Sequence, residues 1–156
     1  MNTGNEARPA RWPWLAASGL VAGLLVNVCE WAAHHGWLET AWAQAFAALG
    51  KEPKGWSTFI PANFWLGVLA VWAYRWASGI YGPGFQTAMR TATAVWLIFW
   101  VIPTSALAPL ELFPNRLLLW TMGIGILDGY AATLLGAWLY DRRRWPSTQR
   151  NFEHVK

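Results

Sequence analysis

Four long runs of apolar residues, separated by short polar segments, dominate the sequence. They cover residues 14–33, 61–78, 87–107 and 116–140. About 20 residues of helix cross the roughly 30 Å hydrocarbon core of a bilayer, so each run is long enough to span a membrane. No alternation of period two indicates a β-barrel, whereas a helix satisfies its own backbone hydrogen bonds inside lipid. The pattern therefore predicts an all-α, polytopic membrane protein built as a bundle of four transmembrane helices.

A fifth helical pattern lies between the first two spans. Its apolar residues recur at the spacing of one helix face, at Leu38, Trp42, Ala45, Phe46 and Leu49. Gly50 can end such a helix, because glycine readily adopts the left-handed conformation that follows a helix end. We expect a short amphipathic helix over residues 38–49 that lies on the outer membrane surface or caps the bundle.

The positive charges divide unequally between the two sides of this helix map. Nine lie on the side of the two termini and three on the other side, the first set being Arg8, Arg11, Arg75, Arg90, Arg142, Arg143, Arg144, Arg150 and Lys156 and the second Lys51, Lys54 and Arg116. Cytoplasmic segments carry the excess of Lys and Arg, so we expect both termini in the cytoplasm. The expected organisation is a cytoplasmic tail over residues 1–13, a transmembrane domain over 14–140 and a basic cytoplasmic tail over 141–156, in a bacterial inner membrane.

The composition narrows the class of protein further. Of the 156 residues, 55% are hydrophobic and 13% are charged, the latter about half the usual share in a soluble domain. The basic residues form short clusters beside the apolar runs and not a basic folded face, which argues against nucleic-acid binding. The abundance of tryptophan, with 14 residues, suits membrane–water interfaces, where an apolar ring with a polar N–H is favoured.

Small residues are spaced along one face of the first span and one face of the fourth. Gly19 and Gly23 form a G-x-x-x-G pattern in the first, and Gly125 and Gly129 form another in the fourth. This spacing lets two helix backbones approach closely. We therefore expect the first and fourth spans to pack together through these glycines.

Among the polar residues of the predicted spans, Asn27, Glu30 and Asp128 are the candidates for chemistry inside the membrane. A lone carboxylate in mid-membrane, as predicted for Asp128, costs at least about 2.5–3.5 kcal/mol, so it must be protonated, paired or exposed to water. Two interpretations stay open. Asp128 is either protonated and makes a structural hydrogen bond to Trp96 or Asn27, or it exchanges a proton. Glu30 is the alternative carboxylate for that exchange.

Other candidate chemistry is sparse. Trp96 and Trp100 lie deeper than the other tryptophans, and with His34 they are candidate contacts for a porphyrin, pigment, quinone or lipid. Glu30 and His34 have a spacing that metal ligands use, but no second such pair exists, so no metal site is predicted. Phosphate-binding loops, dinucleotide fingerprints, nucleophile elbows and metalloprotease motifs are absent from the sequence. We therefore expect no enzymatic activity.

Two stretches of the chain carry a family resemblance. The first span contains AGLLVNVCEW over Ala22–Trp31, and the last ends in LGAWLY over Leu135–Tyr140. In these stretches the chain resembles a set of uncharacterised four-span bacterial integral membrane proteins, and the resemblance covers most of the chain. It implies the four-span fold and no activity.

Three functions remain open at this point. The first is a non-catalytic accessory or assembly subunit of a larger membrane complex, with an energy-transducing complex as one candidate host. Its partners would be the lipid bilayer and other membrane subunits or a second copy. The alternatives are a proton-coupled small-molecule transporter that acts as a homodimer, and an intramembrane porphyrin- or lipid-binding protein.

Overall fold

The computed structural model describes residues 12–52 and 56–144, and every regular element among them is a helix. In chain order these are α1 (Trp12–Ala33), the π-helical turn η1 (His34–Leu38), α2 (Glu39–Ala48), the 3₁₀ turn η2 (Trp56–Thr58), α3 (Ile60–Tyr81), α4 (Phe85–Trp96), the π-helical turn η3 (Leu97–Val101), α5 (Ile102–Leu107), the 3₁₀ turn η4 (Ala108–Leu110) and α6 (Asn115–Arg144). The all-α prediction is thus confirmed for the described residues. The predicted tails 1–13 and 141–156 lie largely outside them, although the last two residues of the first tail belong to α1 and the first four of the second belong to α6.

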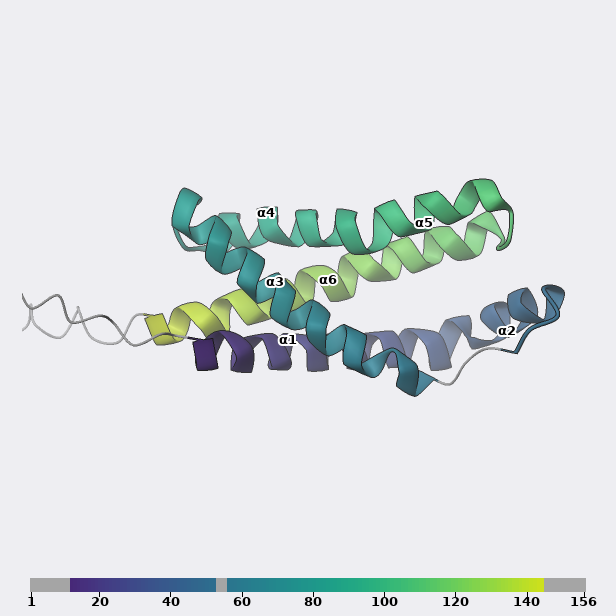
Figure 1. Cartoon of the computed structure of the whole chain (residues 1–156), viewed down its shortest axis with the longest axis horizontal. Coiled ribbons are helices and arrows are strands. Elements are labelled where there is room, and N and C mark those ends of the chain that lie inside the picture. Colours follow the sequence, from purple (N-terminus) through teal and green to yellow (C-terminus); the bar gives the residue numbers. More distant parts are fainter. Residues whose placement is uncertain (1–11, 53–55, 145–156) are drawn as a thin grey trace, which may run out of the picture.

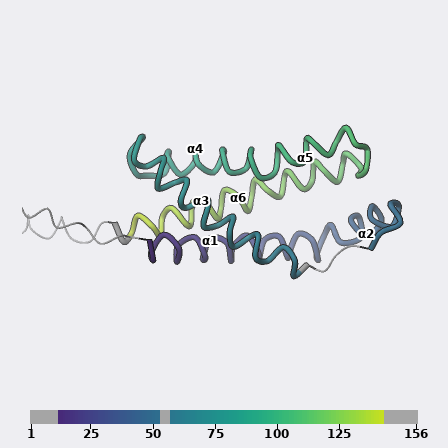
Figure 2. Tube along the Cα trace, in the orientation of Figure 1, coloured from purple at the N-terminus to yellow at the C-terminus, as the bar shows by residue number. Residues whose placement is uncertain are grey.

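The helices form an elongated bundle around α6. α1 packs against α6 on one side, α4 packs against it on another, and α3 crosses α1 obliquely (Figure 1). The start of α1, the end of α6 and the turn between α3 and α4 lie at one end of the bundle, which we call the α3–α4 end. α2 and the turn that precedes α6 lie at the opposite end, the α2 end (Figure 2).

Three helical segments are long and apolar enough to cross a membrane: Trp12–Ala48, Phe85–Leu110 and Asn115–Arg142. They contain the predicted spans 14–33, 87–107 and 116–140, which indicates a helical membrane protein. The remaining predicted span, 61–78, corresponds to α3. This helix is 22 residues long but does not belong to that set, and it carries Asn63 and Arg75 among its apolar residues.

The helix predicted over residues 38–49 continues α1 instead of lying apart from it. The π-helical turn η1 joins α1 to α2, so the chain is helical from Trp12 to Ala48. α2 packs its apolar face on the start of α6, where Leu38, Ala45 and Leu117 are buried together. α2 thus contacts the bundle at this end, and its place relative to a membrane surface stays a prediction.

The glycines of the first span have a different partner from the one predicted. α1 and α6 do pack together, but Gly19 and Gly23 face α3. A Cβ atom on Gly19 would lie 2.5 Å from Cα of Val68, and one on Gly23 would lie 2.6 Å from Cα of Phe64. Gly67 closes the contact from the side of α3, since a Cβ there would overlap the backbone of both α1 glycines. The predicted pairing is wrong because the spacing of small residues signals close approach without specifying the neighbouring helix.

We expect Gly67→Ala to destabilise the bundle by about 1–3 kcal/mol, because the added methyl group must push two helix backbones apart. The thermal unfolding midpoint of the purified protein in detergent measures this effect. Gly79→Ala in the same helix is the matched control, because a Cβ atom at Gly79 meets nothing within 4 Å. Equal midpoints for the two variants would show that α1 and α3 do not pack at Gly67.

Candidate functional site

Asp128 is the most completely buried charged residue of the described chain, with 0% of its surface exposed. It lies in the middle of α6, where its Oδ1 accepts a hydrogen bond of 2.8 Å from the backbone N–H of Gly129. Its Oδ2 has no hydrogen-bond partner among the described residues. Most buried polar atoms in proteins are hydrogen-bonded, so an unpartnered carboxyl oxygen calls for a functional explanation.

The carboxyl group of Glu30 on α1 faces that of Asp128, and the two interact across the contact between α1 and α6. Oε2 of Glu30 also lies 3.1 Å from Nε2 of His34, which follows one helical turn later in the chain. The indole of Trp100 interacts with the same carboxyl group. The structure therefore brings four of the predicted site residues together, and we call Glu30, His34, Trp100 and Asp128 the carboxyl cluster.

Two π-helical turns contribute side chains to the carboxyl cluster. His34 opens η1, and Trp100 lies within η3. A π-helical turn shifts the register of the helix around it and is frequent at functional sites. Pro103 follows η3 closely, and its missing N–H removes one α-helical hydrogen bond at that point. The irregular turns thus occur where the helices carry the residues of the cluster.

The glycines of the last span make room for Trp100. A Cβ atom on Gly125 would overlap the indole ring, and one on Gly129 would lie 3.3 Å from Cζ3 of the same ring. Trp100 is buried as a result. The G-x-x-x-G pattern of α6 therefore accommodates a side chain and not the backbone of the first span.

Asn27 lies one turn from Glu30 but belongs to a separate network. Its amide nitrogen donates to the carbonyl oxygens of Gly23 at 3.0 Å and Ile60 at 3.3 Å, and its Oδ1 accepts a bond of 3.1 Å from the Asn63 amide. These bonds join α1 to the first turn of α3. Because α3 begins here, the next turn of α1, which carries Glu30, packs against α6 instead.

Trp96 also lies outside the carboxyl cluster. Its indole N–H donates to the backbone oxygen of Met122 at 3.0 Å, so it ties α4 to α6. The structural interpretation of Asp128 named Trp96 and Asn27 as its partners, and neither hydrogen-bonds to it. Trp96 and Trp100, which the sequence suggested as ligand contacts, both pack between helices. The third suggested contact, His34, stacks on Trp42 with ring centroids 6.1 Å apart.

Sequence reasoning missed a second polar site, at the α3–α4 end. The Tyr74 hydroxyl donates to the carboxylate of Asp141 and accepts a bond of 3.0 Å from the backbone N–H of Gly84. Tyr74 is completely buried, so one side chain joins α3, the turn before α4 and the end of α6. No spacing along the sequence relates positions so far apart. The one available signal was a tyrosine on the apolar face of a predicted span.

Comparison with known proteins assigns no function to these residues. No protein-family model, curated protein or solved structure matches the chain. Within residues 12–52 and 56–144, no group of three or more His, Cys, Asp and Glu side chains is arranged to hold a metal ion. The function is therefore argued from the carboxyl cluster.

We expect Asp128→Asn to retain the unfolding midpoint of the wild type. The amide keeps an oxygen to accept the Gly129 N–H and adds a donor for Glu30. Asp128→Leu should lower the stability by about 1–3 kcal/mol, because Glu30 then faces an apolar side chain. The measurement is thermal unfolding in detergent followed by circular dichroism.

Leu127→Ala serves as the control for these variants, because this neighbouring side chain is 73% exposed and its truncation should change the midpoint little. A midpoint of Asp128→Leu as high as that of Leu127→Ala would show that the contact between the carboxyl groups does not stabilise the fold.

Proposed function

We propose that this protein is a proton-coupled small-molecule transporter of a bacterial inner membrane, in which Glu30 and Asp128 together bind the coupling proton. The observation that carries the proposal is the pair of facing carboxyl groups between α1 and α6, of which Asp128 is fully buried and Glu30 partly exposed. Two adjacent carboxylates repel each other strongly where water is scarce, so the pair holds a proton. Ionisable side chains within membrane helices are characteristic of proton relays in transporters.

His34 provides a route for that proton. It lies at hydrogen-bonding distance from Glu30, and its side chain is 22% exposed whereas that of Glu30 is 14% exposed. His34 therefore lies between the two carboxyl groups and the α2 end of the bundle. Histidine is a frequent proton carrier, so a proton would pass from the surface through His34 to Glu30 and then to the pair.

In this proposal the two π-helical turns, η1 and η3, are the segments that change conformation. A π-helical turn that reverts to α-helix changes the direction of the side chains beyond it. In η3 such a change would move Trp100 away from Glu30, and in η1 it would move His34. Gain or loss of the proton alters the hydrogen bonds of Glu30 and would thereby bias these turns between two arrangements. Coupling of this kind needs the two arrangements to differ in proton affinity.

We further propose that α3 is the fourth membrane span. Its 22 residues, at about 1.5 Å per residue, give a length of about 33 Å, which exceeds the roughly 30 Å hydrocarbon core. Its polar residues have partners near the two ends: Asn63 bonds to Asn27, and the guanidinium of Arg75 lies 4.7 Å from the centroid of the Trp12 ring. Four spans place both termini on one side, which the distribution of Lys and Arg assigns to the cytoplasm. Because this charge bias favours a single orientation, a homodimer would be parallel.

Topology reporters test this arrangement at three positions. A reporter after Lys156 and one in the turn at Gly84 should both give cytoplasmic signals, and one after Lys51 should give an external signal. Opposite signals at Lys51 and Gly84 are expected because α3 alone separates these positions. The same signal at both would show that α3 does not cross the membrane.

Reconstituted liposomes with a pH-sensitive dye inside test the transport function. We expect at least one solute from a panel of small cations and neutral compounds to drive proton movement through the wild type. Asp128→Asn should abolish this flux, because the amide cannot release a proton, while the folded fraction remains unchanged. Glu39→Gln is the control, since this carboxyl group is exposed at the start of α2 and should be dispensable.

Infrared spectroscopy tests the shared proton without any substrate. The wild type at neutral pH should show the carbonyl band of a protonated carboxyl group, and the double variant Glu30→Gln with Asp128→Asn should lose it. Persistence of the band in the double variant would place the proton elsewhere and contradict the proposal.

An accessory role in a larger complex is the second candidate. The observation that favours it is an exposed aromatic pair at the α2 end, where Trp37 is 61% exposed and its ring centroid lies 4.5 Å from that of Trp120. A partner subunit in the membrane would cover this pair. Co-isolation of larger subunits in mild detergent, together with an absence of proton flux, would favour this role over transport.

A further inference from the structure

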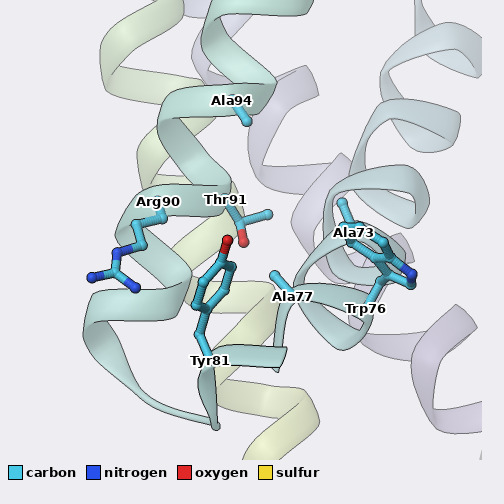
Figure 3. Close-up of a pocket in the computed structure, with 7 residues that line it drawn as sticks. All are labelled: Ala73, Trp76, Ala77, Tyr81, Arg90, Thr91 and Ala94. Carbon is cyan, nitrogen blue, oxygen red and sulfur yellow. The ribbon is translucent and has the colours of Figure 1, made fainter. Parts of the chain in front are cut away.

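A groove of about 540 Å³ opens between α3 and α4, near the α3–α4 end and separate from the carboxyl cluster. Its lining includes the small side chains Ala73 and Ala77 from α3 and Ala94 from α4, together with the buried Thr91. Figure 3 shows Arg90 and Tyr81 together at one side of the groove and Trp76 at the other. Both aromatic side chains are largely exposed, so the groove is open towards the surroundings of the bundle.

The polar side of the groove carries a positive charge that the described chain does not neutralise. The guanidinium of Arg90 lies 5.2 Å from the centroid of the Tyr81 ring, and the described residues form no salt bridge to it. Arg75 and Arg142 lie at the same end, each over a tryptophan ring. The carboxylate found at this end in the described chain, that of Asp141, accepts a hydrogen bond from Tyr74. This end of the groove therefore suits an anion.

The other side of the groove suits a hydrocarbon chain. A groove between membrane helices is filled by lipid tails, because water is excluded from the hydrocarbon core. Alanines at three positions leave space that larger side chains would occupy. The indole N–H of Trp76 and the hydroxyl of Tyr81 are donors of the kind that lie at the level of lipid headgroups. A long arginine side chain can likewise keep its stem in the apolar region and its charge at the interface.

We propose that this groove binds one anionic phospholipid, with the phosphate on Arg90 and an acyl chain along Ala73, Ala77 and Ala94. Basic pockets between helices on the cytoplasmic side of membranes bind anionic headgroups. The proposal uses the membrane orientation given above, in which the α3–α4 end is cytoplasmic, but it does not depend on proton coupling. The site differs from the porphyrin or lipid contact considered from the sequence, which involved Trp96, Trp100 and His34.

Native mass spectrometry of the full chain in detergent tests this proposal, with phosphatidylglycerol and phosphatidylcholine of identical acyl chains added in turn. We expect one phosphatidylglycerol to be retained in preference to phosphatidylcholine. Arg90→Gln should weaken the retention of phosphatidylglycerol about fivefold, the effect of one basic residue near an anionic headgroup. Arg75→Gln is the matched control, because it removes a charge at the same end but outside the groove, and its retention should stay near that of the wild type.

A second variant fills the groove and leaves its charge in place. Ala77→Phe should abolish the preference for phosphatidylglycerol although Arg90 is present, and circular dichroism verifies that each variant is folded. Trp76→Phe is the milder alternative if Ala77→Phe does not fold, and loss of its N–H should reduce retention in part.

Several results would overturn the proposal. Equal weakening by Arg75→Gln and Arg90→Gln would indicate a diffuse surface charge, and equal retention of the two lipids would show that no headgroup is recognised. Displacement of the lipid by inorganic phosphate at the same concentration would indicate a site for a free anion. A dimer that Ala77→Phe disrupts, observed in place of the lipid adduct, would assign the groove to a second copy of the chain.

Discussion

Lipid tails offer no hydrogen-bond partner, and this constraint governs the interior of the protein. Buried hydroxyl groups accordingly donate to backbone oxygens one helical turn earlier, as Thr91 and Thr133 do, and the half-buried Thr121 does the same. The Asn27 amide achieves the same by joining α1 to the start of α3. Asp128 differs from these residues, because its Oδ2 makes no hydrogen bond among the described residues and the polar group that faces its carboxyl group is another carboxyl group, that of Glu30.

The position of the carboxyl cluster follows from the close contact between α1 and α3. Gly67 lets α3 cross directly over Gly19 and Gly23, and the crossing ends where α3 begins, opposite Asn27. One turn further along α1 there is no residue of α3 to cover the helix, so Glu30 meets α6. One face of α1 thus contacts two helices. Its glycines make an apolar contact with α3, and the carboxyl group of Glu30 makes a polar contact with α6. Figure 1 shows the oblique path of α3 across α1.

Of the two proposed sites, one lies in the interior of the bundle and the other at its edge. The carboxyl cluster lies where α1, α6 and the two π-helical turns meet, and the groove lies between α3 and α4. The Tyr74 hydroxyl joins α3, the turn before α4 and the end of α6.

The sequence by itself determined the helical class, because apolar runs of membrane length and their flanking charges are local properties of the chain. It also located Asp128 and Glu30 as the residues needing explanation, since a carboxyl group within an apolar run is costly wherever its partner lies. The neighbours of each helix were decided by the tertiary structure alone. The spacing of Gly19 and Gly23 indicated a close contact but did not specify α3 as the partner. Gly125 and Gly129 contact the Trp100 ring instead of a helix backbone. Helical periodicity specifies which residues share a face, but which helix that face meets depends on crossing angles and side-chain volumes that involve distant parts of the chain.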